Sequence, residues 1–180
     1  MRGLEVEQTI IERQQLHRDG YALLRRAIPA EWLEDLRAVF VEGREPLIGG
    51  GHQPLHRDLS AQRPGDIAIA LAFFDDYGPQ NGATRILPGS HRPEADEAPL
   101  DVHHESRSVQ LSGSAGDILV LDVDLLHAGS LNVIRARRRS ILISYFSEPL
   151  YTSHLETMKL RNVRMDTSER FEPWDFAFGD

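Results

Sequence analysis

The first forty residues have the spacing of apolar side chains that is typical of helices. Residues 5–18 are polar, with apolar positions at roughly helical intervals, and Asp19-Gly20 follows as a helix stop. A short strand is predicted over residues 21–25. A second helix is predicted from Pro29 to about Gly43, with an apolar stripe made of Trp32, Leu33, Leu36, Val39 and Phe40. We expect these helices to lie outside the core.

From Gly49 onward the apolar runs become short and continuous, and turn residues such as Asn81-Gly82 and Pro88-Gly89 separate them. This pattern predicts strands over residues 67–74, 84–87, 109–111, 118–121 and 140–146. Helices followed by strands predict a mainly β fold with N-terminal helices, organised as a double-stranded β-helix (jelly-roll or cupin-like) barrel.

A chain of 180 residues is expected to form a single domain, residues 1–180. Within it, residues 5–43 supply the outer helices and the first strand, and residues 50–147 supply the barrel core. Residues 148–180 are expected to pack on that core, because the tail is too rich in aromatic side chains to remain exposed; these are Phe171, Trp174, Phe176 and Phe178.

Charge and composition narrow the classes of partner. The net charge of −8 disfavours nucleic acid and anionic membrane surfaces. The chain has no cysteine, so a bound metal must take nitrogen and oxygen ligands. No apolar run approaches the roughly 20 residues of a membrane helix. We therefore expect a soluble, cytoplasmic protein that acts on a small molecule.

Candidate chemistry begins with His56-Arg57-Asp58. Residues at i and i+2 of a strand leave the same face about 6.5–7 Å apart, so His56 and Asp58 can converge on one cation. His127 is the best third ligand, because it follows the apolar run 118–121 at the expected rim of a barrel. Two imidazoles and a carboxylate can hold one face of iron(II) and leave the other face open. A lone His-x-Asp is more often a surface pattern, so the context decides.

That context consists of several motifs in a fixed order. They are Asp19-Gly20-Tyr21, Gln53 to Leu59 around the His-x-Asp pattern, Arg63-Pro64-Gly65-Asp66, Asn81 to His91, Gly116-Asp117, and Asn132 with Arg138 after His127. Over residues 16–146 the chain resembles the phytanoyl-CoA dioxygenase family of Fe(II)/2-oxoglutarate-dependent oxygenases.

The resemblance implies a catalytic metal triad of His56, Asp58 and His127, with Fe(II) as cofactor and 2-oxoglutarate and O2 as cosubstrates. It also implies that the arginine eleven residues after His127, Arg138, binds the distal carboxylate of 2-oxoglutarate. Arg137 and Arg139 are the competing choices, and strand alternation places both on the face opposite Arg138. Ser140, Gln53 and Thr84 are further candidates for cosubstrate binding.

The implied reaction is hydroxylation of a small organic substrate with release of succinate and CO2, and the intact Asp58 favours hydroxylation over halogenation. Arg85 is a candidate for binding a substrate anion, or for an ion pair with an acidic loop. Two alternatives remain open. One is a nonredox cupin-type metal-binding protein or isomerase, and the other is a noncatalytic domain that retains the fold.

The chain departs from the family just before the first ligand. Only residues 44–55 separate the expected end of the second helix from His56, where the family usually has a much longer segment. The site is therefore expected to be unusually open, or to be completed by the aromatic tail or by another subunit of a homo-oligomer.

Overall fold

The computed structural model describes residues 2–39, 53–58, 66–92, 105–134, 136–148 and 150–151. The chain divides into two units, residues 1–146 and 147–180, and all the helices and strands discussed below lie in the first. The expected packing of residues 148–180 on the core falls almost wholly outside the described residues and stays a prediction, as does the single domain.

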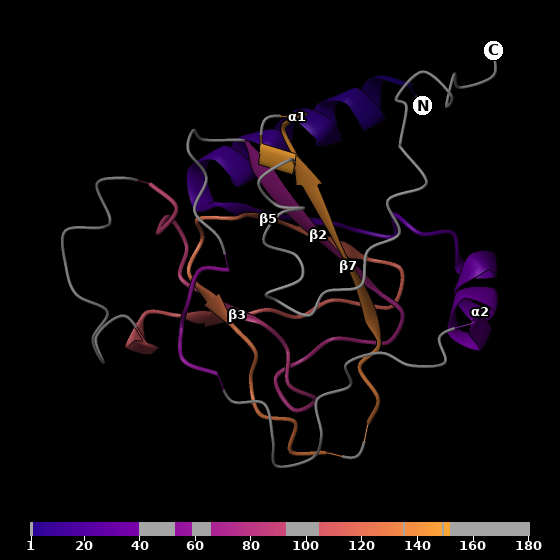
Figure 1. Ribbon diagram of the computed structural model, residues 1–180. Helices are drawn as coiled ribbons and strands as arrows, with labels where there is room; N and C mark the ends of the chain where they lie inside the picture. The colour runs from indigo at the N-terminus through magenta and orange to yellow at the C-terminus, as the bar shows by residue number, and fades with distance from the viewer. Residues whose placement is uncertain are drawn as a thin grey trace. The chain divides into compact units, whose positions relative to one another are not determined.

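Within the described residues of the first unit, two helices and seven strands follow one another (Figure 1). The N-terminal part contains α1 (Arg2–Asp19), β1 (Tyr21–Leu24) and α2 (Ala30–Val39). The strands that follow are β2 (Ile67–Phe73), β3 (Arg85–Ile86), β4 (Val109–Gln110), β5 (Ile118–Asp122), β6 (His127–Ala128) and β7 (Ser140–Phe146). The part of the chain that the structure describes is therefore mainly β with two helices.

The strands form two antiparallel sheets. The larger has the order β1-β5-β2-β7, and the smaller has the order β4-β3-β6. In the smaller sheet Ile86 lies opposite His127 and Arg85 lies opposite Ala128. This register positions the candidate metal ligands.

The core contains the apolar runs that predicted the strands. Ile69 and Phe73 of β2 and Leu119 and Leu121 of β5 are almost completely buried. The side chains of β5 alternate between buried and half-buried, as expected for a strand with one face toward the core.

The predicted helix stop after α1 is confirmed at Gly20. Its N–H bonds to the carbonyl of Leu16 at 2.9 Å, and its φ of 82° is one that side chains other than glycine rarely adopt. A Cβ atom at this position would lie 2.6 Å from Nδ1 of His91. Glycine therefore both ends α1 and admits the turn at residues 88–91 alongside it.

The larger strands agree with the sequence prediction to within one or two residues, whereas β3 and β4 are shorter than predicted. The two-residue strand β6 was not predicted as a strand. Closure of the two sheets into a barrel remains a prediction. Among the described residues, no helix is both long enough and apolar enough to cross a membrane.

Candidate metal centre

His56 and His127 are held together by their backbones. The N–H of each residue bonds to the carbonyl of the other at 3.0 Å, which forms an isolated antiparallel bridge beside β6. Residues directly opposite each other in an antiparallel pair project their side chains on the same side. The two imidazole rings consequently lie 5.0 Å apart, centroid to centroid.

Both imidazoles are oriented in the same way. Nδ1 of His56 donates to the carbonyl of Pro54 at 2.8 Å, and Nδ1 of His127 donates to the carbonyl of Leu125 at 2.9 Å. Each ring thus bonds to the carbonyl two residues before it. A carbonyl oxygen can only accept, so Nδ1 carries the hydrogen in both rings, and Nε2 is left to act as a ligand.

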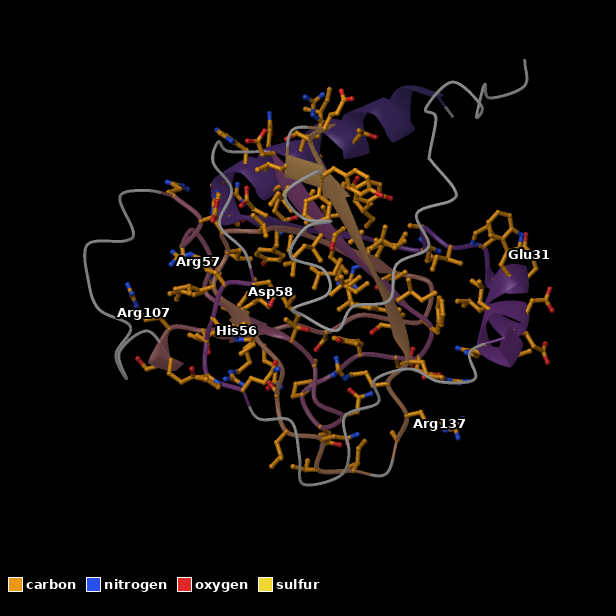
Figure 2. All side chains as sticks on the ribbon, viewed as in Figure 1. Glu31, His56, Arg57, Asp58, Arg107 and Arg137 are labelled. Carbon is orange, nitrogen blue, oxygen red and sulfur yellow. The ribbon has the colours of Figure 1, made fainter. Side chains whose placement is uncertain are left out.

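Asp58 lies between the two Nε2 atoms. One carboxylate oxygen is 3.5 Å from Nε2 of His56, and the other is 3.5 Å from Nε2 of His127. One ligand atom from each of the three residues lies within 4.8 Å of those of the other two. Figure 2 shows His56, Arg57 and Asp58 close together. Side chains of His56 and Asp58 are partly exposed, and that of His127 is largely buried.

The electrostatics favour a cation at this point. A hydrogen bond from His127 holds the pKa of Asp58 below its ordinary value despite burial. Burial alone would lower the pKa of His127, but the hydrogen bonds to Asp58 and to the Leu125 carbonyl raise it. A positive charge between the imidazoles and the carboxylate is therefore stabilised. Two neutral nitrogen donors and one anionic oxygen donor suit iron(II), so the residues fit the implied metal.

The His-x-Asp segment differs from the prediction in one respect. Only His56 pairs as a strand residue, and Asp58 lies after the bridge in irregular backbone. The convergence of the two side chains therefore comes from a single bridge followed by a turn, and does not need a regular strand.

A second polar cluster surrounds the guanidinium of Arg138. Its Nη1 donates to the hydroxyl of Tyr77, and its Cζ lies 4.5 Å from the centroid of the Tyr77 ring. Its buried Nε has no hydrogen-bond partner among the described residues. The Tyr77 hydroxyl lies 3.4 Å from Oγ1 of Thr84. Burial lowers the pKa of Arg138 to about 10, as expected for a guanidinium that lacks a carboxylate partner.

Strand alternation relates this cluster to the metal ligands. Thr84 comes two residues before Ile86, which pairs with His127, so Thr84 and His127 project on the same face of the smaller sheet. Residues i and i+2 of a strand are about 6.5–7 Å apart along the strand, a distance that a five-carbon dicarboxylate can span.

The two competing arginines have different environments. Arg139 forms a bidentate ion pair with Asp75, with N–O distances of 2.9 and 2.8 Å, and its backbone N–H bonds to the same carboxylate. Arg137 is exposed and lies at the periphery in Figure 2. Of the three, only Arg138 has a buried side-chain nitrogen without a hydrogen-bond partner among the described residues.

The remaining candidates have mixed surroundings. Ser140 begins β7 opposite Phe73. Gln53 is exposed, and its side-chain oxygen accepts from the N–H of Gly129 at 2.9 Å. Arg85 is buried; it donates to the carbonyls of Gln53 and Gly129 and forms a 2.8 Å ion pair with Glu105. The expected ion pair with the acidic loop is thus present, and substrate binding by Arg85 stays a prediction.

Tyr77 was missed by the sequence reasoning, because it follows Asp75-Asp76 in what the sequence shows only as a turn. An aromatic residue among polar turn residues is the one signal that the sequence offers. In the structure Tyr77 is 3% exposed and stacks on Phe73, with ring centroids 4.0 Å apart.

Comparison with known proteins identifies the family. Residues 44–140, more than half of the chain, match the model of the family described as phytanoyl-CoA dioxygenase (PhyH). The protein therefore belongs to the phytanoyl-CoA dioxygenase family, as the motifs predicted.

Curated relatives include proteins named as dioxygenases. The chain is 26% identical over 135 residues to dioxygenase ALT11 of Alternaria alternata, which covers 70% of the chain and 42% of that protein. It is 25% identical over 116 residues to ectoine dioxygenase of Nocardia farcinica, covering 51% of the chain and 39% of that protein. The chain thus spans less than half the length of these relatives.

Solved structures with the same fold include AviO1 from Streptomyces viridochromogenes Tue57, with a TM-score of 0.61 and 19% identity over 77% of the chain and 95% of AviO1. The non-heme alpha ketoglutarate dependent carbocyclase SnoK from nogalamycin biosynthesis also has a TM-score of 0.61, with 13% identity over 90% of the chain and 93% of SnoK. At these identities the likeness shows a shared fold and no more.

Proposed function

We propose that the protein is an Fe(II)/2-oxoglutarate-dependent dioxygenase that hydroxylates a small organic substrate and releases succinate and CO2. The observation that carries the proposal is the convergence of His56, Asp58 and His127, with both Nε2 atoms turned toward one carboxylate. Membership of the phytanoyl-CoA dioxygenase family supports the choice of metal and cosubstrate.

His56, Asp58 and His127 would hold the iron, and when bound, iron with 2-oxoglutarate supplies the oxidising chemistry. The protein's own contribution is orientation. The Pro54 and Leu125 carbonyls fix the hydrogen on Nδ1 of each imidazole, which keeps both Nε2 lone pairs available to the metal. Asp58 supplies the one negative charge of the triad.

Arg138 is the proposed anchor for the distal carboxylate of 2-oxoglutarate. A half-buried guanidinium whose buried Nε is unpaired has capacity for a charge-assisted hydrogen bond to a carboxylate. The hydroxyls of Tyr77 and Thr84 lie in the same cluster and would supply further donors. Ser140 and Gln53 are retained as cosubstrate-binding candidates, and Arg85 as a substrate-binding candidate.

The proposal is tested by adding iron(II) and 2-oxoglutarate to the 180-residue protein without oxygen. We expect a visible charge-transfer band from the iron chelate, followed on admission of O2 by succinate formation. Substrates are then sought as compounds that increase succinate release.

Two controls separate the proposal from its alternatives. Zinc(II) in place of iron(II) should give neither band nor succinate. A protein that binds both metals equally, shows no band with 2-oxoglutarate and forms no succinate would instead be a nonredox metal-binding protein, and a protein that binds neither metal would be a noncatalytic domain.

A further inference from the structure

Arg57 lies between two prospective metal ligands but bonds away from them. Its Nε donates to the carbonyl of Asp124 at 2.6 Å, and its Nη2 donates to the carbonyl of Ser90 at 2.8 Å. One guanidinium therefore ties the His-x-Asp segment to the loop that precedes His127 and to the turn at residues 87–90.

Ser90 connects the same turn to His127 from the other side. Its buried hydroxyl accepts the N–H of Leu126 at 2.9 Å, and the N–H of Leu87 bonds to the carbonyl of Leu126 at 2.9 Å. Both backbone groups of the residue next to His127 are thus held by one turn. Gly89 makes that turn possible through its φ of 80°, and the Ser90 N–H closes it on the Leu87 carbonyl at 3.2 Å.

These contacts form a closed circuit around the metal centre. It runs from His127 across the backbone bridge to His56, along the chain to Arg57, through Ser90 to Leu126, and back along the chain to His127. The circuit also encloses the Leu125 carbonyl that orients the His127 ring, because Arg57 holds the residue before Leu125 and Ser90 holds the residue after it.

We propose that Arg57 and Ser90 are positioning residues that form a clamp, which holds in place the backbone bridge between the two histidine ligands and the Leu125 carbonyl that orients the His127 ring. This inference rests on the proposed metal centre. Partners that orient metal ligands through hydrogen bonds commonly change metal affinity by about 10–100-fold when they are removed.

The choice of arginine follows from geometry. Two carbonyl acceptors in different segments require two donors in a fixed arrangement, which the planar guanidinium provides and the single ammonium of lysine does not. A role that depended only on positive charge would be preserved in Arg57→Lys, whereas the clamp would be broken.

The test uses cobalt(II), whose visible spectrum reports ligand geometry without turnover. In Ser90→Ala and Arg57→Lys we expect the Kd for cobalt(II) to rise about 10–100-fold and the visible bands to change. In the metal-free protein, hydrogen exchange at the Leu126 N–H is expected to be faster in Ser90→Ala. Ser90→Ala removes the hydroxyl that accepts from Leu126 and keeps the backbone carbonyl that accepts from Arg57, so it is the milder variant and tests the clamp even if Arg57→Lys fails to fold.

Matched controls separate positioning from general destabilisation. Arg37 also donates to a backbone carbonyl, that of Phe74 at 2.6 Å, and the Ser108 hydroxyl bonds to the carbonyl of Glu105 at 2.8 Å. Arg37→Lys and Ser108→Ala should lower thermal stability by similar amounts and leave the cobalt(II) Kd and spectrum unchanged.

Cobalt(II) binding and spectra equal to those of the wild type in both clamp variants, or an equal loss in the controls, would overturn the clamp. If the wild type forms no succinate while the clamp variants still loosen cobalt(II) and expose the Leu126 N–H, the proposed oxygenase function fails and the clamp stands.

Discussion

His56 and His127 lie directly opposite each other and exchange both of their backbone hydrogen bonds, each 3.0 Å long. The bridge places two imidazoles from distant parts of the sequence on one side of the smaller sheet, with their ring centroids 5.0 Å apart. Because each ring also bonds to the carbonyl two residues earlier, the backbone fixes both the separation and the orientation of the two nitrogen ligands.

Replacing Asp58 removes the only carboxylate of the triad. Asp58→Ala should abolish succinate formation and should reduce iron(II) affinity by more than the roughly 10–100-fold that is typical when a residue hydrogen-bonded to a metal ligand is removed. The reason is that the two remaining imidazoles are neutral and cannot offset the charge of the ion. Chelator competition measures the first effect and succinate assays the second. Glu34→Ala, on the exposed face of α2, is the control. Undiminished activity of Asp58→Ala would remove this residue from the triad.

Arg138 and Arg137 provide a matched pair of neighbouring arginines. Arg138→Ala should leave the distal carboxylate of 2-oxoglutarate unpaired in a buried site, at a cost of about 3–5 kcal/mol, which raises the apparent Kd for 2-oxoglutarate more than 100-fold. Arg137→Ala, at an exposed position, should change it little. Titration of the charge-transfer band measures both values. A larger effect in Arg137→Ala would transfer the assignment to that residue.

Tyr77→Phe tests the hydroxyl in the Arg138 cluster. Loss of one buried partner is expected to cost about 1–3 kcal/mol, which weakens 2-oxoglutarate binding roughly 5–150-fold. Metal affinity should not change, because Tyr77 contacts Arg138 and Thr84 and none of the three metal ligands in the contacts described. Tyr145→Phe, on exposed β7, is the control. A raised Kd for the metal in Tyr77→Phe would show that the Arg138 cluster and the metal ligands are not independent.

The parts of the fold that could be predicted are those with a local pattern. The continuous apolar runs of β2 and β5 predicted buried strands, and Asp19-Gly20 predicted the end of α1, because burial and positive φ each restrict the residue types allowed. His56, Asp58 and His127, which the structure brings together, were all named from the sequence, with the family resemblance supplying the context that a lone His-x-Asp lacks. Their role as metal ligands stays a prediction.

The parts that could not be predicted depend on tertiary contacts. The two-residue strand β6 is too short for a period to be seen, and the exact lengths of β3 and β4, which are shorter than predicted, depend on their partners in the smaller sheet. Nothing in the sequence around Tyr77 indicates that its hydroxyl meets Arg138, or that Arg57 and Ser90 bond across the fold. Arg139 in turn was a competitor of Arg138 in sequence, and the ion pair of Arg139 with Asp75 becomes visible only in the structure.

The Asp75–Arg139 ion pair predicts a pH-dependent contribution to stability. The hydrogen bond from Arg139 holds the pKa of Asp75 below its ordinary value of 3.8, so ionised Asp75 stabilises the folded state. That contribution is fully present above the unfolded-state pKa of about 4, and is lost as the pH falls through the lower folded-state value. Asp75→Asn leaves the largely buried Arg139 without its carboxylate and should lower the free energy of unfolding by about 3 kcal/mol at neutral pH.

Urea unfolding from pH 7 to pH 3 measures this effect. The difference between wild type and Asp75→Asn is expected to be constant above about pH 5 and to shrink below about pH 4, because the wild-type carboxyl group then takes up the proton that makes it resemble the amide. Asp35→Asn, on the exposed face of α2, should show little difference at any pH. A difference for Asp75→Asn that stays constant down to pH 3 would mean that the lost stability comes from packing and not from the charge of Asp75.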